Sequence, residues 1–400
     1  MTADSPAGTR YFSPALLLVL RLIRIAIGTE IAPRPFVPAA AGFDWDLFEK
    51  EVTRHRIGAF LLHRLPAPVL ITFPRDTLGR LQEAAAVTKQ RAEARAEALR
   101  QLCRELEEEQ IHVVSVKGPV LAQVLYENAT IRHAGDLDLL IDPADVDRLE
   151  SFMRRTGRRR STPHNELSPA QERLYREIRR EYGYVNDATG VRIEVMWRLG
   201  GARLAADSLG EDYRFADLDG QRIRLLGAET EALYLFDHGT RHGWFRLFWL
   251  IDVALLVRQG GINWDRLVQR AREIGVQRAL WQGVVLAHEL LGSPLPGAFH
   301  GSPPTAVPRL VFDGYRHIGR PEVESTKDQP LWRAFYNLRR HDRWITWLDD
   351  VRSMALFPLI ASDAPPLADR PWLFLLLRPW LWASGRLRRL LKGPPRAVER

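Results

Sequence analysis

The pattern of apolar and polar positions predicts a small sheet set between helical regions. Apolar residues recur at helical spacing before the sheet, and the helical period returns from Gly227 onward. Runs with the two-residue period of a strand occupy only the middle of the chain. The expected helices before the sheet cover residues 14–28, 43–65 and 77–110, and the expected strands cover residues 111–116, 136–141, 182–186 and 191–197.

The segment between the first two strands is rich in residues that could bind phosphate. It contains a Lys117-Gly118 turn, a short helix opened by Pro119 and a polar loop that carries Arg132. Backbone N–H groups at the start of such a helix can hold a phosphate, so Lys117 and Gly118 are candidate phosphate-binding residues. The alternative explanation is a tight turn at Gly118 and a surface strand end at Lys117.

Carboxylates alternate with leucines in the second strand, so Asp136 and Asp138 point to the same face. Two carboxylates about 4 Å apart repel by roughly 4 kcal/mol at an effective dielectric near 20, and a cation removes that cost. Mg²⁺ binds a few carboxylates together with waters and phosphates, which predicts a magnesium–nucleotide site. Glu194 is the best candidate for a third carboxylate. Pairing of the aspartates with Lys117 or Arg132 would explain them as well.

The composition indicates a globular protein that favours anionic partners. Its 400 residues are 46% hydrophobic and 26% charged, enough for a sizeable core in two or three domains. The net charge of +8 favours nucleotides, nucleic acid or an acidic membrane face as partners. The single cysteine, Cys103, excludes an intramolecular disulfide and indicates a reducing compartment, so we expect a cytoplasmic protein.

Changes of period and composition divide the chain into five parts. The clearest boundary is a stretch rich in Pro, Gly and Ser that follows the middle helices. We expect an N-terminal helical segment (1–76), an α/β core (77–226), a helical domain closing over the core (227–293), a Pro-rich linker (294–308) and a C-terminal helical extension (309–400).

The helical domain carries an expected polar network. His238 and His242 have the spacing of metal ligands on a helix, but no Glu follows His238 as a metalloprotease would require. We expect His242, Trp244, Arg246 and Asp252 to join this domain to the carboxylates. Asp252 lies in an apolar helix and needs a partner, which we expect to be Arg246.

Two arginine-rich segments could contact RNA or an anionic membrane surface. The first is a turn-rich insert after residue 156, for which a solvated surface loop with a helix is the alternative. The second is the tail from residue 371, which is interrupted by Arg378 and Pro379 and therefore does not predict a membrane-spanning helix. Docking of the tail on the body is its alternative. The basic residues are Arg158, Arg159 and Arg160 in the insert and Arg386, Arg388, Arg389 and Lys392 in the tail.

The motifs of the middle of the chain resemble a known family. The pattern V-K-G-x3-A-x3-Y-x5-R-x3-D-L-D-L-L-I is followed by D-P-x-D-V-D, by IEVMWRL and by helical stretches between residues 235 and 296. In these features the chain is similar to the bacterial nucleotidyltransferase family of unknown substrate, within the polymerase-β-like nucleotidyltransferase superfamily. The resemblance covers about residues 45–296.

The resemblance implies an α/β (α+β) nucleotidyltransferase core with a mixed sheet, flanked by mainly α-helical N-terminal, middle and C-terminal parts. It implies transfer of a nucleoside monophosphate from an NTP, such as ATP, to an acceptor, with release of pyrophosphate. The acceptor could be a small molecule, RNA or a protein, and the cofactor would be Mg²⁺ or Mn²⁺. The implied catalytic and metal-binding residues are Asp136, Asp138 and Glu194, and the implied phosphate-binding residues are Lys117, Gly118 and Arg132.

Two positions depart from the family pattern. Lys117-Gly118 stands where the superfamily has a Gly-Ser or Gly-Gly turn, and Met196 stands where the family's acid-x-His-Trp stretch has a histidine. A catalytically inactive nucleotide-binding or scaffold protein is therefore one alternative function. A basic RNA or membrane-surface binder is the other, because of the two arginine-rich segments.

Overall fold

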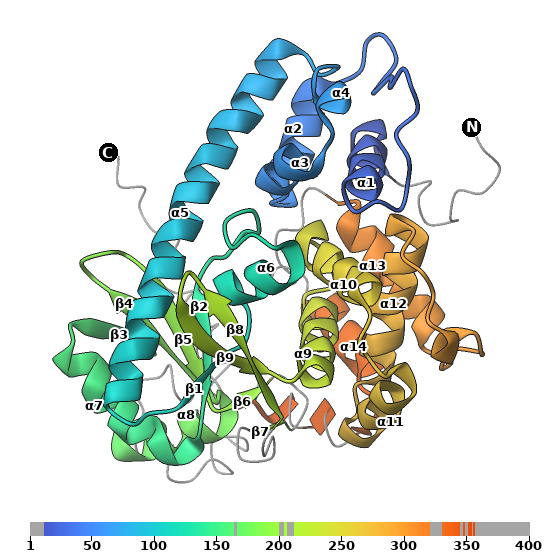
Figure 1. Ribbon diagram of the computed structural model, residues 1–400. Helices are drawn as coiled ribbons and strands as arrows, with labels where there is room; N and C mark the ends of the chain where they lie inside the picture. Colours follow the sequence, from blue (N-terminus) through green and yellow to red (C-terminus); the bar gives the residue numbers. More distant parts are fainter. Residues whose placement is uncertain are drawn as a thin grey trace, which may run out of the picture.

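A seven-stranded mixed sheet lies at the centre of the described structure, with helices on both faces (Figure 1). The computed structural model describes residues 12–163, 166–199, 204–205, 212–320, 330–344, 347–348, 351–353 and 355–356. The strands are β1 (Val113–Ser115), β2 (Leu137–Ile141), β3 (Arg158–Thr162), β4 (Glu181–Asn186), β5 (Arg192–Met196), β8 (Tyr213–Leu218) and β9 (Gln221–Leu226), and β6 (Arg198–Leu199) pairs separately with β7 (Leu204–Ala205).

The helices fall into an N-terminal group, a group around the sheet and a group beside it (Figure 1). The first group is α1 (Pro14–Ala26), α2 (Trp45–Arg54), α3 (Gly58–Arg64), α4 (Ala67–Leu70) and the long α5 (Arg75–Glu108). The second is α6 (Gly118–Tyr126), α7 (Val146–Arg155) and α8 (Pro169–Ile178). The third is α9 (Ala228–Arg241), α10 (Leu247–Gln259), α11 (Trp264–Ile274), α12 (Gln277–Leu291), α13 (Val307–Ile318) and α14 (Pro330–Arg340).

The strand order is β3-β4-β5-β2-β1-β9-β8. β2 pairs in parallel with β5 and β1 in parallel with β9, while the other neighbours are antiparallel. The predicted hairpin is confirmed, because β4 and β5 are antiparallel and Asn186 donates to the Val191 carbonyl, 3.0 Å from nitrogen to oxygen, across the turn. The predicted strand at 136–141 is also present, although it begins one residue later, at Leu137.

The sheet separates two hydrophobic clusters, and the alternation along β2 and β5 decides which side chain enters which cluster. Leu137, Leu139, Ile193 and Val195 pack with α5, α7 and α8 on one face. Leu140 and Met196 pack with α6, α9 and α10 on the other. Because side chains alternate, Asp138 and Glu194 lie on the second face, toward the third group of helices.

The N-terminal helices form as the apolar periodicity predicts. Ser13 caps α1 by accepting a hydrogen bond from the Leu16 N–H, 3.1 Å from nitrogen to oxygen. The apolar residues of α1 are buried in the same cluster as α12, while Arg21 and Arg24 both pair with Glu30 at 2.9 Å. This explains how two arginines interrupt an apolar helix that is packed on the body of the protein.

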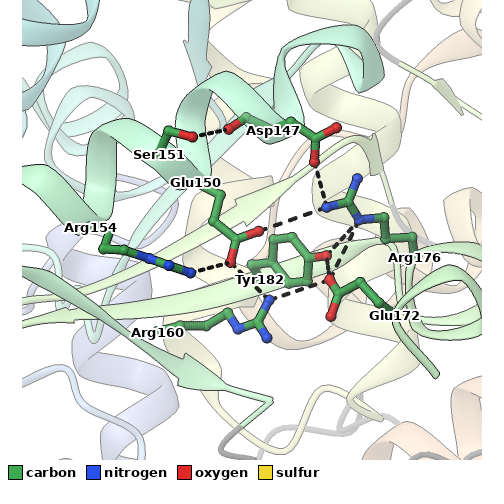
Figure 2. A network of polar contacts seen from close by, with 8 residues as sticks. All are labelled: Asp147, Glu150, Ser151, Arg154, Arg160, Glu172, Arg176 and Tyr182. Carbon is green, nitrogen blue, oxygen red and sulfur yellow. Dashed lines mark hydrogen bonds and ion pairs between the residues drawn. The ribbon is translucent and has the colours of Figure 1, made fainter. Parts of the chain in front are cut away.

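The arginine-rich insert contains the strand β3 and the helix α8; the alternative of a solvated loop with a helix included the helix but not the strand. Arg158 and Arg159 on β3 pair with Glu105 at 2.7 Å and with Asp187 at 3.1 Å. Figure 2 shows Arg160 between Glu150 of α7 and Glu172 of α8, at 3.1 and 3.3 Å. The charges of this arginine run are therefore compensated within the fold.

No helix in the described part of the chain is long and apolar enough to cross a membrane. α13 packs on α12 through Val307, Val311 and Tyr315. The tail arginines Arg386, Arg388 and Arg389, together with Lys392, lie outside the described residues.

Candidate active site

Three carboxylates gather where β2 and β5 lie side by side. The parallel register places Asp138 directly opposite Glu194, and Asp136 immediately precedes β2. Asp138 is 3% exposed, whereas Asp136 and Glu194 are half-buried. The structure thus brings together the three acidic residues that the sequence pattern selected.

Two of the three carboxyl groups, Glu194 and Asp136, have raised pKa values. Burial, together with the charges of Asp136 and Asp138, raises the pKa of Glu194 to about 7. Burial and the Asp138 charge also raise the pKa of Asp136, against the opposing effect of Lys117, Arg95 and Arg56. A concentration of negative charge that binds protons this strongly also suits a cation.

Lys117 is the cation closest to Asp138 in the described structure. Its Nζ lies 3.0 Å from Asp138 Oδ1 and 5.7 Å from the centre of the Tyr234 ring. Burial disfavours the ammonium form, but the charges of Asp138, Tyr234 and Asp136 together outweigh burial, so the pKa of Lys117 is raised. Pairing with Lys117, the alternative explanation of the aspartates, is therefore present for Asp138.

Gly118 gives the turn its shape. It has a φ of +72°, in the left-handed region, and it begins α6 directly after Lys117. A Cβ at this position would lie 3.9 Å from the Asp136 carbonyl oxygen, an ordinary contact. The backbone conformation, rather than lack of space, therefore requires glycine here.

Arg132 is buried against Asp252 in an arrangement that differs from our expectation. Its Nε and Nη2 donate to the two Asp252 carboxylate oxygens at 2.8 and 2.7 Å, and the Tyr126 hydroxyl donates to the same group at 2.6 Å. The Arg132 side chain is 3% exposed. The predicted pairing of Asp252 with Arg246 is wrong, and we assign Arg132 to joining the loop before β2 to α10 instead of to phosphate.

The other expected members of the polar network make aromatic contacts. Trp244 is fully buried, and a Cβ at Gly239 would lie 2.3 Å from its ring, so it fills a space that only glycine leaves open. The His242 ring lies 4.6 Å from that of His238 and 5.0 Å from that of Trp249. The Arg246 guanidinium lies 5.0 Å from the Phe245 ring.

Sequence reasoning missed the side of the site that α9 supplies. Tyr234 and His238 lie one turn apart on this helix, and both interact electrostatically with Lys117. Burial and the Lys117 charge lower the pKa of His238 well below its usual value, so its imidazole is neutral. The spacing of Tyr234, His238 and His242 on one helix face was the available signal, but nothing in the sequence placed that face against Lys117.

A pocket of about 470 Å³ lies away from these carboxylates, beside β3 and α7. Its lining includes Glu150, Arg154, Arg159, Arg160 and Asp187. These side chains already pair with one another, as Figure 2 shows for Glu150, Arg154 and Arg160. We therefore place the candidate active site at the carboxylates and not in this pocket.

Comparison with known protein families decides the broad class. A sequence model described as "Uncharacterised nucleotidyltransferase" matches residues 41–292, more than half of the chain. The chain belongs to this nucleotidyltransferase family. The match extends from just before α2 to the end of α12, so it includes the N-terminal helices α2 to α5 as well as the sheet and the helices beside it. Searches of curated proteins and of solved structures found no match.

Proposed function

We propose that this nucleotidyltransferase moves a nucleoside monophosphate from an NTP to an acceptor hydroxyl or phosphate, with Mg²⁺ or Mn²⁺ as cofactor. The observation that carries the proposal is the placement of Asp138 opposite Glu194 on neighbouring strands, with Asp136 beside them. Such an arrangement agrees with a polymerase-β-like core, which the resemblance of the motifs also suggests.

The donor set suits a hard divalent cation. All three groups are carboxylates, the ligands that Mg²⁺ prefers, and Asp138 Oδ1 is buried without a well-directed hydrogen bond despite its closeness to Lys117. In the described ranges no group of three His, Cys, Asp or Glu side chains, these carboxylates included, is arranged to hold a metal ion by itself. Asp136, Asp138 and Glu194 would therefore complete a site together with nucleotide phosphates, as Mg²⁺ commonly does.

In the reaction an acceptor oxygen forms a bond to the α-phosphorus while the bond from that phosphorus to the bridging oxygen breaks, and pyrophosphate leaves. Bound metal would supply Lewis-acid stabilisation of the phosphate charge. Asp136 and Asp138 would hold it, and Glu194 would hold a second ion or accept the proton of the acceptor hydroxyl. A pKa of about 7 leaves much of Glu194 ionised and able to accept a proton at neutral pH. Lys117 would offset charge on the phosphates.

One observation favours the catalytically inactive alternative. Lys117 already neutralises Asp138 from the position where the superfamily has a small Gly-Ser or Gly-Gly turn. A protein that binds nucleotide without transferring it could keep this ion pair permanently. Met196, the second departure from the family pattern, is buried in the hydrophobic cluster. It bears on catalytic activity only because it lies near Glu194.

A label-transfer experiment distinguishes an active nucleotidyltransferase from a protein that only binds nucleotide. Protein, Mg²⁺ and each NTP carrying a labelled α-phosphate would be incubated with small-molecule, RNA and protein fractions of a cell extract. We expect label to enter one fraction, and Asp136→Asn to abolish this, while Asp219→Asn, an exposed turn carboxylate paired with Arg100, serves as the control. Nucleotide binding without transfer to any of the three fractions would support the inactive alternative.

A further inference from the structure

Two arginines of α5 lack acidic neighbours on their own helix. Arg91 and Arg95 are four residues apart and share a face, which is unfavourable for like charges. None of the positions three or four residues from either one is acidic; they are Val87, Thr88, Ala92, Ala94, Ala98 and Leu99. The rest of α5 alternates acidic and basic residues, but on this face no acidic residue of the helix balances the two arginines.

The fold directs this face to the candidate active site. Arg95 Nε donates to the carbonyl oxygen of Gly135 at 3.3 Å, and Gly135 directly precedes Asp136. Arg95 Nη1 donates to the Arg91 carbonyl oxygen at 2.9 Å, which fixes the guanidinium along the helix. Figure 1 shows α5 passing from the N-terminal helices along the sheet. The helix α5 thus reaches the end of β2 at which Asp136 stands.

A third arginine joins them from the sheet. Arg192 is the first residue of β5, and the pairing of Ile193 with Leu137 places it beside Asp136. Arg192 and Glu194 lie on the same face of β5 because they are two residues apart. Arg95 interacts electrostatically with Asp136 and with both other arginines, so Arg91, Arg95 and Arg192 gather near the Asp136 end of the acidic group.

These three arginines have no carboxylate within ion-pair distance in the described parts of the chain, unlike their neighbours. On the same helix, Arg100 pairs with Asp219 at 3.0 Å and Arg104 approaches Glu97 at 3.9 Å.

The positive charge of the arginines on α5 changes the pKa of a nearby histidine. Burial and the charges of Arg56, Arg95, Arg132 and Arg91 lower the pKa of His133 to about 3. A positive potential of this kind beside a carboxylate cluster suits an anion that also carries metal.

We propose that Arg91, Arg95 and Arg192 bind the β- and γ-phosphates of the NTP, the part that leaves as pyrophosphate. Guanidinium groups bind phosphate oxygens in a bidentate manner and stay charged, so they suit a leaving group on which negative charge develops. The helix α5 is then a wall of the active site. This inference rests on the proposed function, and it adds the residues that hold the leaving group.

The test compares ligands that contain or lack the β- and γ-phosphates. The full-length protein would be titrated by calorimetry with the four NTPs, the corresponding monophosphates and inorganic pyrophosphate, each with Mg²⁺. The variants are Arg91→Gln/Arg95→Gln and Arg192→Gln, with Arg104→Gln as a control of equal charge change on the same helix. Circular dichroism and thermal melting check that the variants fold, which we expect because the substituted positions are partly exposed.

We expect the double variant to weaken NTP and pyrophosphate binding at least tenfold, to leave monophosphate binding within twofold, and Arg104→Gln to bind as wild type. Unchanged NTP and pyrophosphate affinity would overturn the inference and leave the proposed function standing. Equal losses for NTP and monophosphate would overturn the assignment to the β- and γ-phosphates. If the wild-type protein binds pyrophosphate but no NTP, and the double variant loses pyrophosphate binding, the arginine site stands and the proposed function is refuted. Binding of neither would refute both.

Discussion

The raised pKa of Glu194 makes a quantitative prediction about stability. An ordinary glutamate pKa is 4.5, and burial beside Asp136 and Asp138 raises this one to about 7. The folded state therefore binds a proton more tightly than the unfolded state does. The stability that this proton provides is fully present below about pH 4.5 and is lost as the pH rises through about 7. At about 1.4 kcal/mol per pKa unit the loss amounts to about 3 kcal/mol.

The replacement Glu194→Gln removes this dependence because glutamine does not titrate. We expect the variant to gain about 3 kcal/mol in free energy of unfolding relative to wild type between pH 4.5 and pH 8. Urea denaturation followed by tryptophan fluorescence, with EDTA present and at matched ionic strength, measures both proteins at the two pH values. Equal changes with pH in wild type and variant would refute the account of the acidic cluster.

Three further predictions concern the groups around this cluster. Asp252→Asn leaves the Arg132 guanidinium buried with a weakened partner and should lower the free energy of unfolding by about 3–5 kcal/mol in urea denaturation, whereas Arg132→Met/Asp252→Leu should recover much of that loss. Gly118→Ala should destabilise by about 1–2 kcal/mol because of its left-handed φ. Gly79→Ala, near the start of α5 where a Cβ meets open space, should stabilise by about 1 kcal/mol in the same assay. Mg²⁺ at pH 8 should raise the melting temperature of wild type but not of Asp136→Asn, since only a folded site binds the ion.

The sequence predicted the elements whose side chains follow a regular period. The alternation in β2 and β5 placed Asp136, Asp138 and Glu194 on one face, and the structure agrees. The long helix α5 and the helical nature of α1 also followed from apolar spacing. Local periodicity suffices for these features because it depends on only a few neighbouring residues.

Long-range partners could not be predicted in the same way. Asp252 was expected to pair with Arg246, six residues away, but its partner is Arg132, separated by 120 residues. Nothing in the charge pattern of α5 predicts a contact with the strand, and only the fold shows that Arg95 reaches Gly135. Such contacts depend on how the strands order themselves in the sheet, which no single segment encodes.

The arginine run on β3 illustrates the same limit. Its composition suggested a surface for RNA or membrane, yet Arg160 lies between acidic residues of α7 and α8 (Figure 2). Glu150 and Glu172 are ten or more residues from Arg160 along the chain. Charge counted along a sequence therefore does not tell whether the charge is available to a partner.

The most direct test of the central claim is calorimetric titration of ATP, GTP, CTP and UTP with Mg²⁺ into wild type and into an Asp136→Asn/Asp138→Asn variant. Circular dichroism must first show that the variant is folded, because Asp138 pairs with Lys117. We predict that wild type binds at least one NTP only when Mg²⁺ is present, and that the variant does not. Equal binding by both proteins, or no binding by wild type, would contradict the assignment of these carboxylates to a metal–nucleotide site.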